Sequence, residues 1–283
     1  MRIPASSRKQ ALDWSLVLVS QGIETTIDPG EDGARWGLLV ASEDYQNAVN
    51  SIQQYRIENR GWPWQREIFR PGVFFDWGSL AWVALLGLFF ALDVRINLHE
   101  AGFMDAASVA RGQWWRLFTG IWLHADVAHL AGNAGLGLVL LGLVMGRFGT
   151  GAGLLAAYLA GAGGNGLVWL LLPERGPSLG ASGMVMGSLG LLAVQSLSFW
   201  RKTPHAYRYL TAGIFGGVML FVLVGLSPGT DVLAHLGGFV SGLLLGAVLT
   251  WLPAIGRHTA VNLACGLLFA LLVILPWWLA LRS

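Results

Sequence analysis

The sequence predicts an all-α polytopic membrane protein preceded by a small α/β domain. Of its 283 residues, 54% are hydrophobic and only 12% are charged, which is more apolar surface than a soluble core can bury. After residue 70, uncharged segments of roughly the 20 residues that a bilayer requires follow one another. We therefore expect a soluble domain at 1–70, followed by a membrane-spanning part.

The charge and the cysteine count exclude several classes of function. A formal net charge of +2, with 18 basic residues in no dense run, does not give the basic surface that nucleic acid requires. The single cysteine, Cys265, lies in an apolar stretch, so one chain can form neither a disulfide nor a cysteine metal site. We expect no nucleic-acid partner, no metal ion and no cofactor.

The first 70 residues predict a small α/β domain. The apolar runs Trp14–Val19 and Trp36–Val40 predict two strands, with Pro29-Gly30 at a turn between them. Ser42 then offers a helix cap, and apolar side chains recur at helical spacing within Tyr45–Tyr55. This amphipathic helix is expected to pack against the two strands; the alternative is a helix that lies on a lipid surface.

Seven apolar segments follow, and each is expected to cross the membrane as a helix. Basic residues occupy alternate connections, which the positive-inside rule assigns to the cytoplasm. The N-terminus is therefore expected in the cytoplasm, and the second, fourth and sixth spans should begin near the extracytoplasmic face. The basic positions are the N-terminal tail, Arg147, Arg201, Lys202, Arg208 and Arg257. The approximate spans are Trp77–Ile96, Val127–Gly146, Thr150–Leu172, Leu179–Trp200, Tyr209–Leu226, Val232–Pro253 and Thr259–Leu281.

The connection between the first two spans is long and amphipathic. Tryptophan and arginine side chains are stable at the membrane–water interface, so we expect this segment, which contains both, to lie there. For the same reason, Trp277-Trp278 at the end of the last span suits an interfacial anchor. The connection contains Arg95, Arg111, Trp114, Trp115 and Arg116.

Four polar side chains stand out within the predicted spans, where polar groups are costly and often functional. His129 and Asn133 are four residues apart and share one face of the second span. Ser182 stands at the start of the fourth span and His235 at the start of the sixth. Because alternate spans reverse direction, all four are expected at one membrane depth, where a water-accessible cavity could bring them together.

Small residues recur every four positions on the fourth and sixth spans. Such faces let two helices approach closely, which would bring His235 within hydrogen-bond reach of Ser182, as activation of a nucleophile requires. Each signal alone also has a structural explanation: helix packing for the glycines, an interhelical hydrogen bond for His235, and helix capping for Asp231. The small residues are Gly183 and Gly187 on one span and Ala234, Gly238, Gly242 and Gly246 on the other.

Together these motifs resemble the rhomboid family of intramembrane serine proteases. The resemblance covers about Trp77 to Pro253. It implies a six-span core at 71–256 and one additional span at 257–283, an arrangement that resembles a known variation of that family. It rests on the order and spacing of Trp115-Arg116, His124, His129-x-x-x-Asn133, Gly180-x-Ser182-Gly183 and Ala234-His235-x-x-Gly238.

The resemblance implies a catalytic dyad without an acidic third member, with Ser182 as nucleophile and His235 as general base. It implies an oxyanion site formed by Asn133, His129 and the backbone N–H of Ser182. Met186 departs from the family pattern, in which an aromatic residue often packs against the histidine, and is expected to alter positioning or substrate preference rather than abolish activity. The supporting residues are then His124, Trp115, Arg116, Gly180, Gly183 and Gly238.

The expected substrates are single-span membrane proteins, cleaved near the extracytoplasmic side of a bacterial cell membrane. A first alternative is a rhomboid-like pseudoenzyme that binds membrane proteins without cutting them, although such relatives typically lose the serine or the histidine, which this chain keeps. A second is a transporter or metal-binding membrane protein that uses His124, His129 and His235. No Asp or Glu lies deep within any predicted span, so that alternative lacks acidic ligands.

Overall fold

The computed structural model describes residues 1–30, 36–59, 74–195, 206–226, 230–252, 255 and 258–283. The chain divides into two compact units, Met1–Gly72 and Val73–Ser283. Several positions used in the sequence interpretation lie outside the described residues: the predicted domain boundary near residue 70, Trp200, Arg201, Lys202, Pro253 and Arg257.

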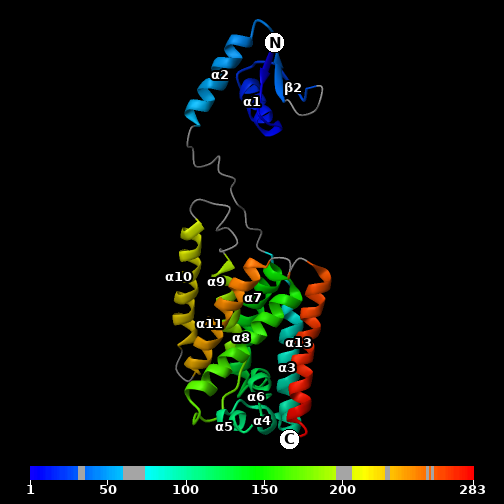
Figure 1. The fold of residues 1–283 in the computed structure, drawn as a ribbon, viewed down its shortest axis with the longest axis vertical. Helices are drawn as coiled ribbons and strands as arrows, with labels where there is room; N and C mark the ends of the chain where they lie inside the picture. The colour runs from blue at the N-terminus through cyan, green and yellow to red at the C-terminus, as the bar shows by residue number, and fades with distance from the viewer. Residues whose placement is uncertain (31–35, 60–73, 196–205, 227–229, 253–254, 256–257) are drawn as a thin grey trace. The chain divides into compact units, whose positions relative to one another are not determined.

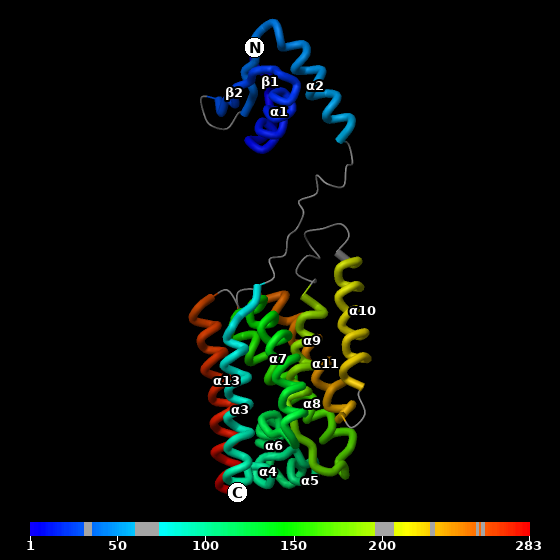
Figure 2. Tube along the Cα trace, turned by 180° about the vertical axis from the view of Figure 1, so that it is seen from behind, coloured from blue at the N-terminus to red at the C-terminus, as the bar shows by residue number. Residues whose placement is uncertain are grey.

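The first unit is a three-stranded antiparallel sheet with two helices (Figures 1 and 2). The strand order is β1-β3-β2, with β1 at Arg2–Pro4, β2 at Thr25–Asp28 and β3 at Gly37–Val40. The predicted strand at Trp36–Val40 is thus confirmed as β3. The helices are α1, Arg8–Ser20, and α2, Tyr45–Glu58.

The strand predicted at Trp14–Val19 is wrong, because this run lies inside α1. Ser7 caps the helix by accepting a hydrogen bond from the Gln10 backbone N–H at 3.2 Å. Ala11, Trp14 and Leu18 are buried on one face, at spacings of three and four residues. This short apolar run is therefore part of a longer helical pattern.

The predicted amphipathic helix is confirmed as α2, but it begins later than Ser42. Its N-cap is Asp44, whose side chain makes no capping hydrogen bond within the described residues. α2 packs against α1, and its buried Ala48 and Ile52 join the same hydrophobic core as β3.

The second unit is entirely helical apart from one isolated β-bridge in the part that the structure describes. Six of its described helices are long and apolar enough to cross a membrane. They are α3 (Ser79–Ile96), α7 (Val127–Phe148), α8 (Thr150–Leu171), α10 (Ala206–Gly225), α11 (Val232–Trp251) and α13 (Thr259–Ala280). The polytopic all-α class is therefore confirmed for this unit.

The fourth predicted span differs from the prediction, because its described helix, α9, covers only Ser182–Ala193. It does not begin at Leu179. Gly180 has a φ of +127°, a conformation that glycine adopts readily and that a right-handed helix does not contain. The nucleophile candidate thus stands at the first residue of a short helix.

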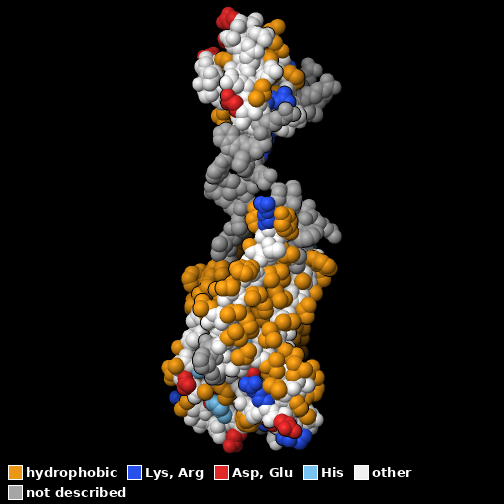
Figure 3. All heavy atoms as spheres, turned by 90° about the vertical axis from the view of Figure 1, so that its left-hand side faces the viewer, with side chains coloured by type: hydrophobic (Ala, Val, Ile, Leu, Met, Phe, Trp, Pro, Cys, Tyr) orange, Lys and Arg blue, Asp and Glu red, His pale blue; other side chains and the backbone are white. Residues whose placement is uncertain are grey.

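Short helices fill the connection between α3 and α7. They are α4 (Leu98–Gly102), α5 (Ala106–Ala110), α6 (Arg116–Thr119) and the 3₁₀ turn η2 (Gly120–Trp122). α4, α5 and α6 gather at one end of the helical unit (Figures 1 and 2), and α7, α9 and α11 all begin toward that end. Hydrophobic side chains cover the visible sides of the long helices, whereas charged side chains gather at this end (Figure 3).

The seventh apolar helix, α13, packs against α8 and α6. Trp277 is only 6% exposed and stacks on Phe89 with ring centroids 5.2 Å apart. The interpretation of Trp277 as an interfacial anchor is therefore wrong, because its ring fills the space beside Gly102 of α4. Trp278 is exposed, with the Arg282 guanidinium 4.1 Å from its ring centroid.

Candidate active site

Two glycine-lined faces bring α9 and α11 into backbone contact. A Cβ atom added to Gly238 would lie 2.2 Å from the Gly183 carbonyl oxygen, and one added to Gly242 would lie 2.1 Å from the Gly187 carbonyl oxygen. No side chain fits between such surfaces. The expected close approach of these helices is confirmed, and it places the segments that begin with Ser182 and Ala234-His235 side by side.

The segment before Ser182 is fixed to the connection between α3 and α7 by backbone hydrogen bonds. Ser178 and Met104 exchange two bonds of 2.8 and 2.9 Å, and the Gly180 N–H donates to the Gly120 carbonyl at 2.9 Å. Ser182 follows directly and is half-buried at the start of α9. Its hydroxyl is therefore presented from a constrained turn rather than from a free loop.

His235 is 3% exposed, and its Nδ1 lies 2.7 Å from the Gly225 carbonyl oxygen at the end of α10. A carbonyl oxygen can only accept a hydrogen bond, so Nδ1 must carry the proton of the neutral ring. Nε2 is then left with a free lone pair. This is the tautomer that a general base needs, and a backbone carbonyl supplies the orienting contact.

The cap predicted at Asp231 is confirmed. Its Oδ1 accepts from the Ala234 backbone N–H at 3.1 Å, which satisfies one free donor at the start of α11.

A cavity of about 700 Å³ opens among the starts of α7, α9 and α11. Ser182, His235, His129 and Asn133 all line it, so the structure brings together the four polar residues that the sequence singled out. The side chains of Ser182 and His235, both among the described residues, are not hydrogen-bonded to each other. Hydrogen bonds between catalytic residues often form only once substrate is bound. The remaining lining residues are Ala125, Asp126, Ala128, Gly132, Leu136, Arg175, Pro177, Ser178, Leu179, Val185, Met186, Val224, Thr230 and Asp231.

His129 and Asn133 face the turn that precedes Ser182. A Cβ added to Gly180 would lie 2.7 Å from His129 Cε1 and 3.5 Å from Asn133 Nδ2, so glycine is required there for space as well as for its positive φ. Asn133 is 8% exposed, and its buried Nδ2 has no hydrogen-bond partner among the described residues. An unsatisfied buried donor is costly, and here it borders the cavity beside the serine.

His124 lies behind His129, with the ring centroids 5.2 Å apart. It is 1% exposed and does not line the cavity. Burial, assisted by the neighbouring His129, lowers the pKa of His124 to about 4. His124 is therefore neutral at physiological pH and occupies a supporting position.

Arg116 ties the connection between α3 and α7 together. Its guanidinium donates to the carbonyl oxygens of Phe103 at 2.9 Å and Glu100 at 3.0 Å, and to Gln113 Oε1 at 2.6 Å. The neighbouring Trp115 packs against the main hydrophobic core. Both residues lie outside the cavity lining, and their contacts hold the connection that carries Met104 and Gly120.

Met186 is 2% exposed and lines the cavity one turn after Ser182. Its sulfur is 3.5 Å from the position that a Cβ on Gly225 would occupy. Met186 therefore lies beside Gly225, whose carbonyl oxygen contacts the imidazole of His235.

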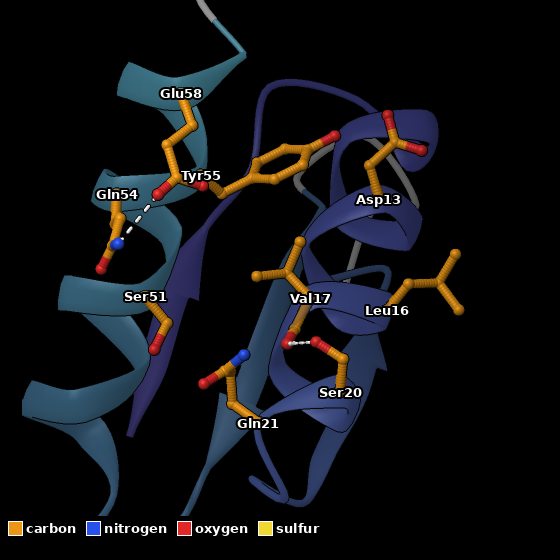
Figure 4. A pocket seen from close by; sticks show the side chains of 9 residues that line it. All are labelled: Asp13, Leu16, Val17, Ser20, Gln21, Ser51, Gln54, Tyr55 and Glu58. Carbon is orange, nitrogen blue, oxygen red and sulfur yellow. Dashed lines mark hydrogen bonds between the residues drawn. The ribbon is translucent and has the colours of Figure 1, made fainter.

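The first unit contains another cavity, of about 520 Å³, between α1 and α2 (Figure 4). Its described lining has carboxyl groups from Asp13 and Glu58 and the phenol of Tyr55, but no histidine that could activate a serine. Glu58 accepts from Gln54 within α2 at 2.8 Å. In the part of the chain that the structure describes, no group of three or more His, Cys, Asp or Glu side chains could hold a metal ion.

Two site features were not predicted. Gly225 contacts His235 through its backbone carbonyl oxygen, and no sequence motif identifies such a contact. Arg175, whose Nε is 3.5 Å from Asp231 Oδ2, comes from a polar connection where one arginine carries no special signal.

Comparison with known proteins places these features in a family context. Residues 111–252 match the Rhomboid domain family, a range that contains every predicted site residue. The chain is 37% identical over 170 residues to RHOMBOID-like protein 1 of Arabidopsis thaliana, covering 59% of this chain and 43% of that protein. It is 33% identical over 198 residues to Rhomboid protease GluP of Bacillus subtilis (strain 168), covering 66% and 37%.

A fungal relative, Rhomboid-type serine protease 2 of Emericella nidulans, is 30% identical over 155 residues, covering 53% of this chain and 29% of that protein. The chain spans about half or less of the length of these curated relatives.

Proposed function

The chain belongs to the rhomboid family, and from this premise we propose that it is an intramembrane serine protease that hydrolyses peptide bonds in or near transmembrane segments. Two of its relatives are named as a rhomboid protease and a rhomboid-type serine protease. The observation that carries the proposal is the contact of His235 Nδ1 with the Gly225 carbonyl, at 2.7 Å, in a cavity that Ser182 shares.

In the proposed mechanism, Nδ1–H remains bonded to the Gly225 carbonyl while Nε2 of His235 takes the proton of the Ser182 hydroxyl. The serine oxygen attacks the peptide carbonyl and forms a tetrahedral intermediate. The imidazolium then donates its Nε2 proton to the leaving amine, which leaves an acyl-enzyme. A water molecule, deprotonated by the same Nε2, attacks the ester. The imidazolium returns that proton to the Ser182 oxygen as the bond between this oxygen and the acyl carbon breaks, which releases the carboxylic acid product and restores the enzyme.

The oxyanion of the intermediate is proposed to bind to Asn133, His129 and the Ser182 backbone N–H. Asn133 Nδ2 supports this role because it is buried and has no partner among the described residues. It can therefore donate to the developing charge without breaking a bond of the resting protein. Such preorganised donors are worth more in a low-dielectric site than in water.

The proposed substrates are single-span membrane proteins within the lipid bilayer. A helical peptide bond is shielded by its own hydrogen bonds, so we expect small or helix-breaking residues near the cleaved bond. Cleavage is proposed near the extracytoplasmic face, with the N-terminus in the cytoplasm, as the basic connections indicate.

The proposed domains remain 1–70, 71–256 and 257–283. The multi-pass character follows from the six apolar helices among the described residues. The expected bacterial origin gains no support from the relatives, which come from a plant, a bacterium and a fungus.

The test is cleavage of a single-span reporter by the purified full chain in liposomes, with Ser182→Ala and His235→Ala as comparisons. We expect cleavage by the wild type and none by either variant. Wild-type protein that binds the reporter in several lipid compositions without cutting it would contradict the proposal and favour the pseudoenzyme.

A further inference from the structure

One ion pair joins the two segments that lead into the proposed catalytic residues. Arg175 lies in the connection between α8 and α9, seven residues before Ser182. Asp231 caps α11, four residues before His235. The Arg175 Nε and Asp231 Oδ2 atoms are 3.5 Å apart, and both residues line the cavity.

The Asp231 carboxylate depends on Arg175 for compensation of its charge. Oδ1 is occupied by the Ala234 backbone N–H. Oδ2 is buried, and within the described chain no donor forms a hydrogen bond to it. A buried carboxylate oxygen without a donor is expensive, and the nearby guanidinium is the opposite charge that offsets this cost. The side chain of Asp231 is 14% exposed and that of Arg175 38%.

The charges of this pair stand close to the imidazole that would act as base. Asp231 and His235 are one helical turn apart on α11, a spacing that puts their Cβ atoms about 6 Å apart. At such separations in a partly buried site, the Coulomb interaction between a unit charge and a protonated imidazole is appreciable. A paired Arg175 and Asp231 present nearly zero net charge, whereas either one alone presents a full charge.

Few other charges face His235. Asp126 and His129 contribute from the start of α7, and His129 interacts electrostatically with His235. Among the described residues, α9 offers the hydroxyl of Ser182, α8 has no ionisable group besides Tyr158, and Tyr207, Arg208 and Tyr209 lie at the opposite end of α10.

We propose that Arg175 and Asp231 form a charge-compensated pair that sets the electrostatic field at His235 and thereby the pH range in which the dyad works. The inference rests on the proposed function and extends it with two positioning residues. Arg175 prevents the Asp231 carboxylate from stabilising the protonated, inactive form of the base, and Asp231 prevents Arg175 from destabilising it.

The direction of each change follows from the charge that remains. Arg175→Gln leaves an uncompensated anion, which favours imidazolium, so the acid limb of the kcat profile moves to higher pH. Asp231→Asn leaves an uncompensated cation and moves that limb to lower pH, while asparagine keeps the helix cap. We expect shifts of about half a pH unit in opposite directions. The double variant should return close to the wild-type profile.

The experiment measures kcat against pH for the full-length protein in liposomes with a single-span reporter, and the melting temperature of each variant. Arg175→Lys keeps the charge and should leave the profile in place. Glu174→Gln, which makes the same charge change as Asp231→Asn at a neighbouring exposed position outside the cavity lining, is the matched control.

Opposite shifts that cancel in the double variant would support the inference. Shifts in one direction, no shifts, or a double variant that keeps the full shift of either single variant would overturn it while leaving the protease function intact. A wild type without Ser182-dependent cleavage would instead overturn the proposed function, and this inference with it.

Discussion

Gly238→Ala should separate α11 from α9 and thereby disable the proposed dyad. The added Cβ would lie 2.2 Å from the Gly183 carbonyl oxygen and 3.1 Å from its Cα, whereas ordinary contact begins near 3.4 Å. The obstacle is backbone, so no side chain can rotate away, and the helices must move apart by about 1 Å at this point. Because Gly238 follows His235 by three residues, that displacement passes directly to the imidazole.

A misplacement of about 1 Å in an active site can reduce the rate about 100-fold, and overpacking of this kind costs about 1 to 3 kcal/mol of stability. Alanine also favours a helix over glycine by about 1 kcal/mol, so the net loss of stability should be small beside the loss of rate. We expect kcat for a single-span reporter to fall about 100-fold, with a lower melting temperature.

The matched control is Gly166→Ala on α8, where a Cβ would meet nothing within 4 Å in the described part of the chain. That variant should retain its activity and melt at the same or a higher temperature. Gly238→Ala with wild-type kcat would refute the argument that this contact sets the geometry of the dyad.

Three further predictions test other parts of the structure. Asn133→Ala should lower kcat about 100-fold without lowering the melting temperature, because Nδ2 satisfies no partner among the described residues; a large loss of stability would show a structural role instead. Trp277→Ala should destabilise the protein by about 3 to 5 kcal/mol, whereas Trp278→Ala, at a ring that is 47% exposed, should change the melting temperature little; equal effects would contradict the burial of Trp277. Because the pKa of His124 falls from 6.5 to about 4 in the folded protein, the unfolded chain binds the additional proton and stability should decrease as pH falls between these values. His124→Leu should flatten that part of the melting profile, and an unchanged slope would exclude His124 as its cause.

The helical class and the convergence of the polar residues could be predicted because both follow from patterns that are local in sequence. Apolar length marks the spans, and a period of four marks the glycine faces of α9 and α11. His129 and Asn133 share a face by spacing alone. Alternation of direction then brings the starts of three helices to one end, where the cavity lies.

The wrong predictions have two causes. A short apolar run fits either a strand or a helix, and a contact with a residue distant in the sequence leaves no local pattern. The apolar run Trp14–Val19 is short enough for a strand, but the cap at Ser7 and the buried Ala11 and Leu18 show that it belongs to a longer helix. The sequence near Trp277 suits an interfacial residue, because nothing in its own span shows that Gly102 leaves room for its ring.

The unpredicted parts of the site have the same origin. The orienting acceptor for His235 is the carbonyl of Gly225, ten residues earlier, and carbonyls are present at every position. Arg175 acquires significance only because folding brings it to Asp231, 56 residues later in the chain.

In the proposed mechanism, His235 Nε2 activates the Ser182 hydroxyl. The most direct measurement is modification of the purified full chain with a fluorophosphonate, which reacts with activated serines, followed by mass spectrometric assignment of the modified residue. We expect one adduct, on Ser182, that is lost in His235→Ala. No adduct on Ser182, or equal labelling in His235→Ala, would contradict it.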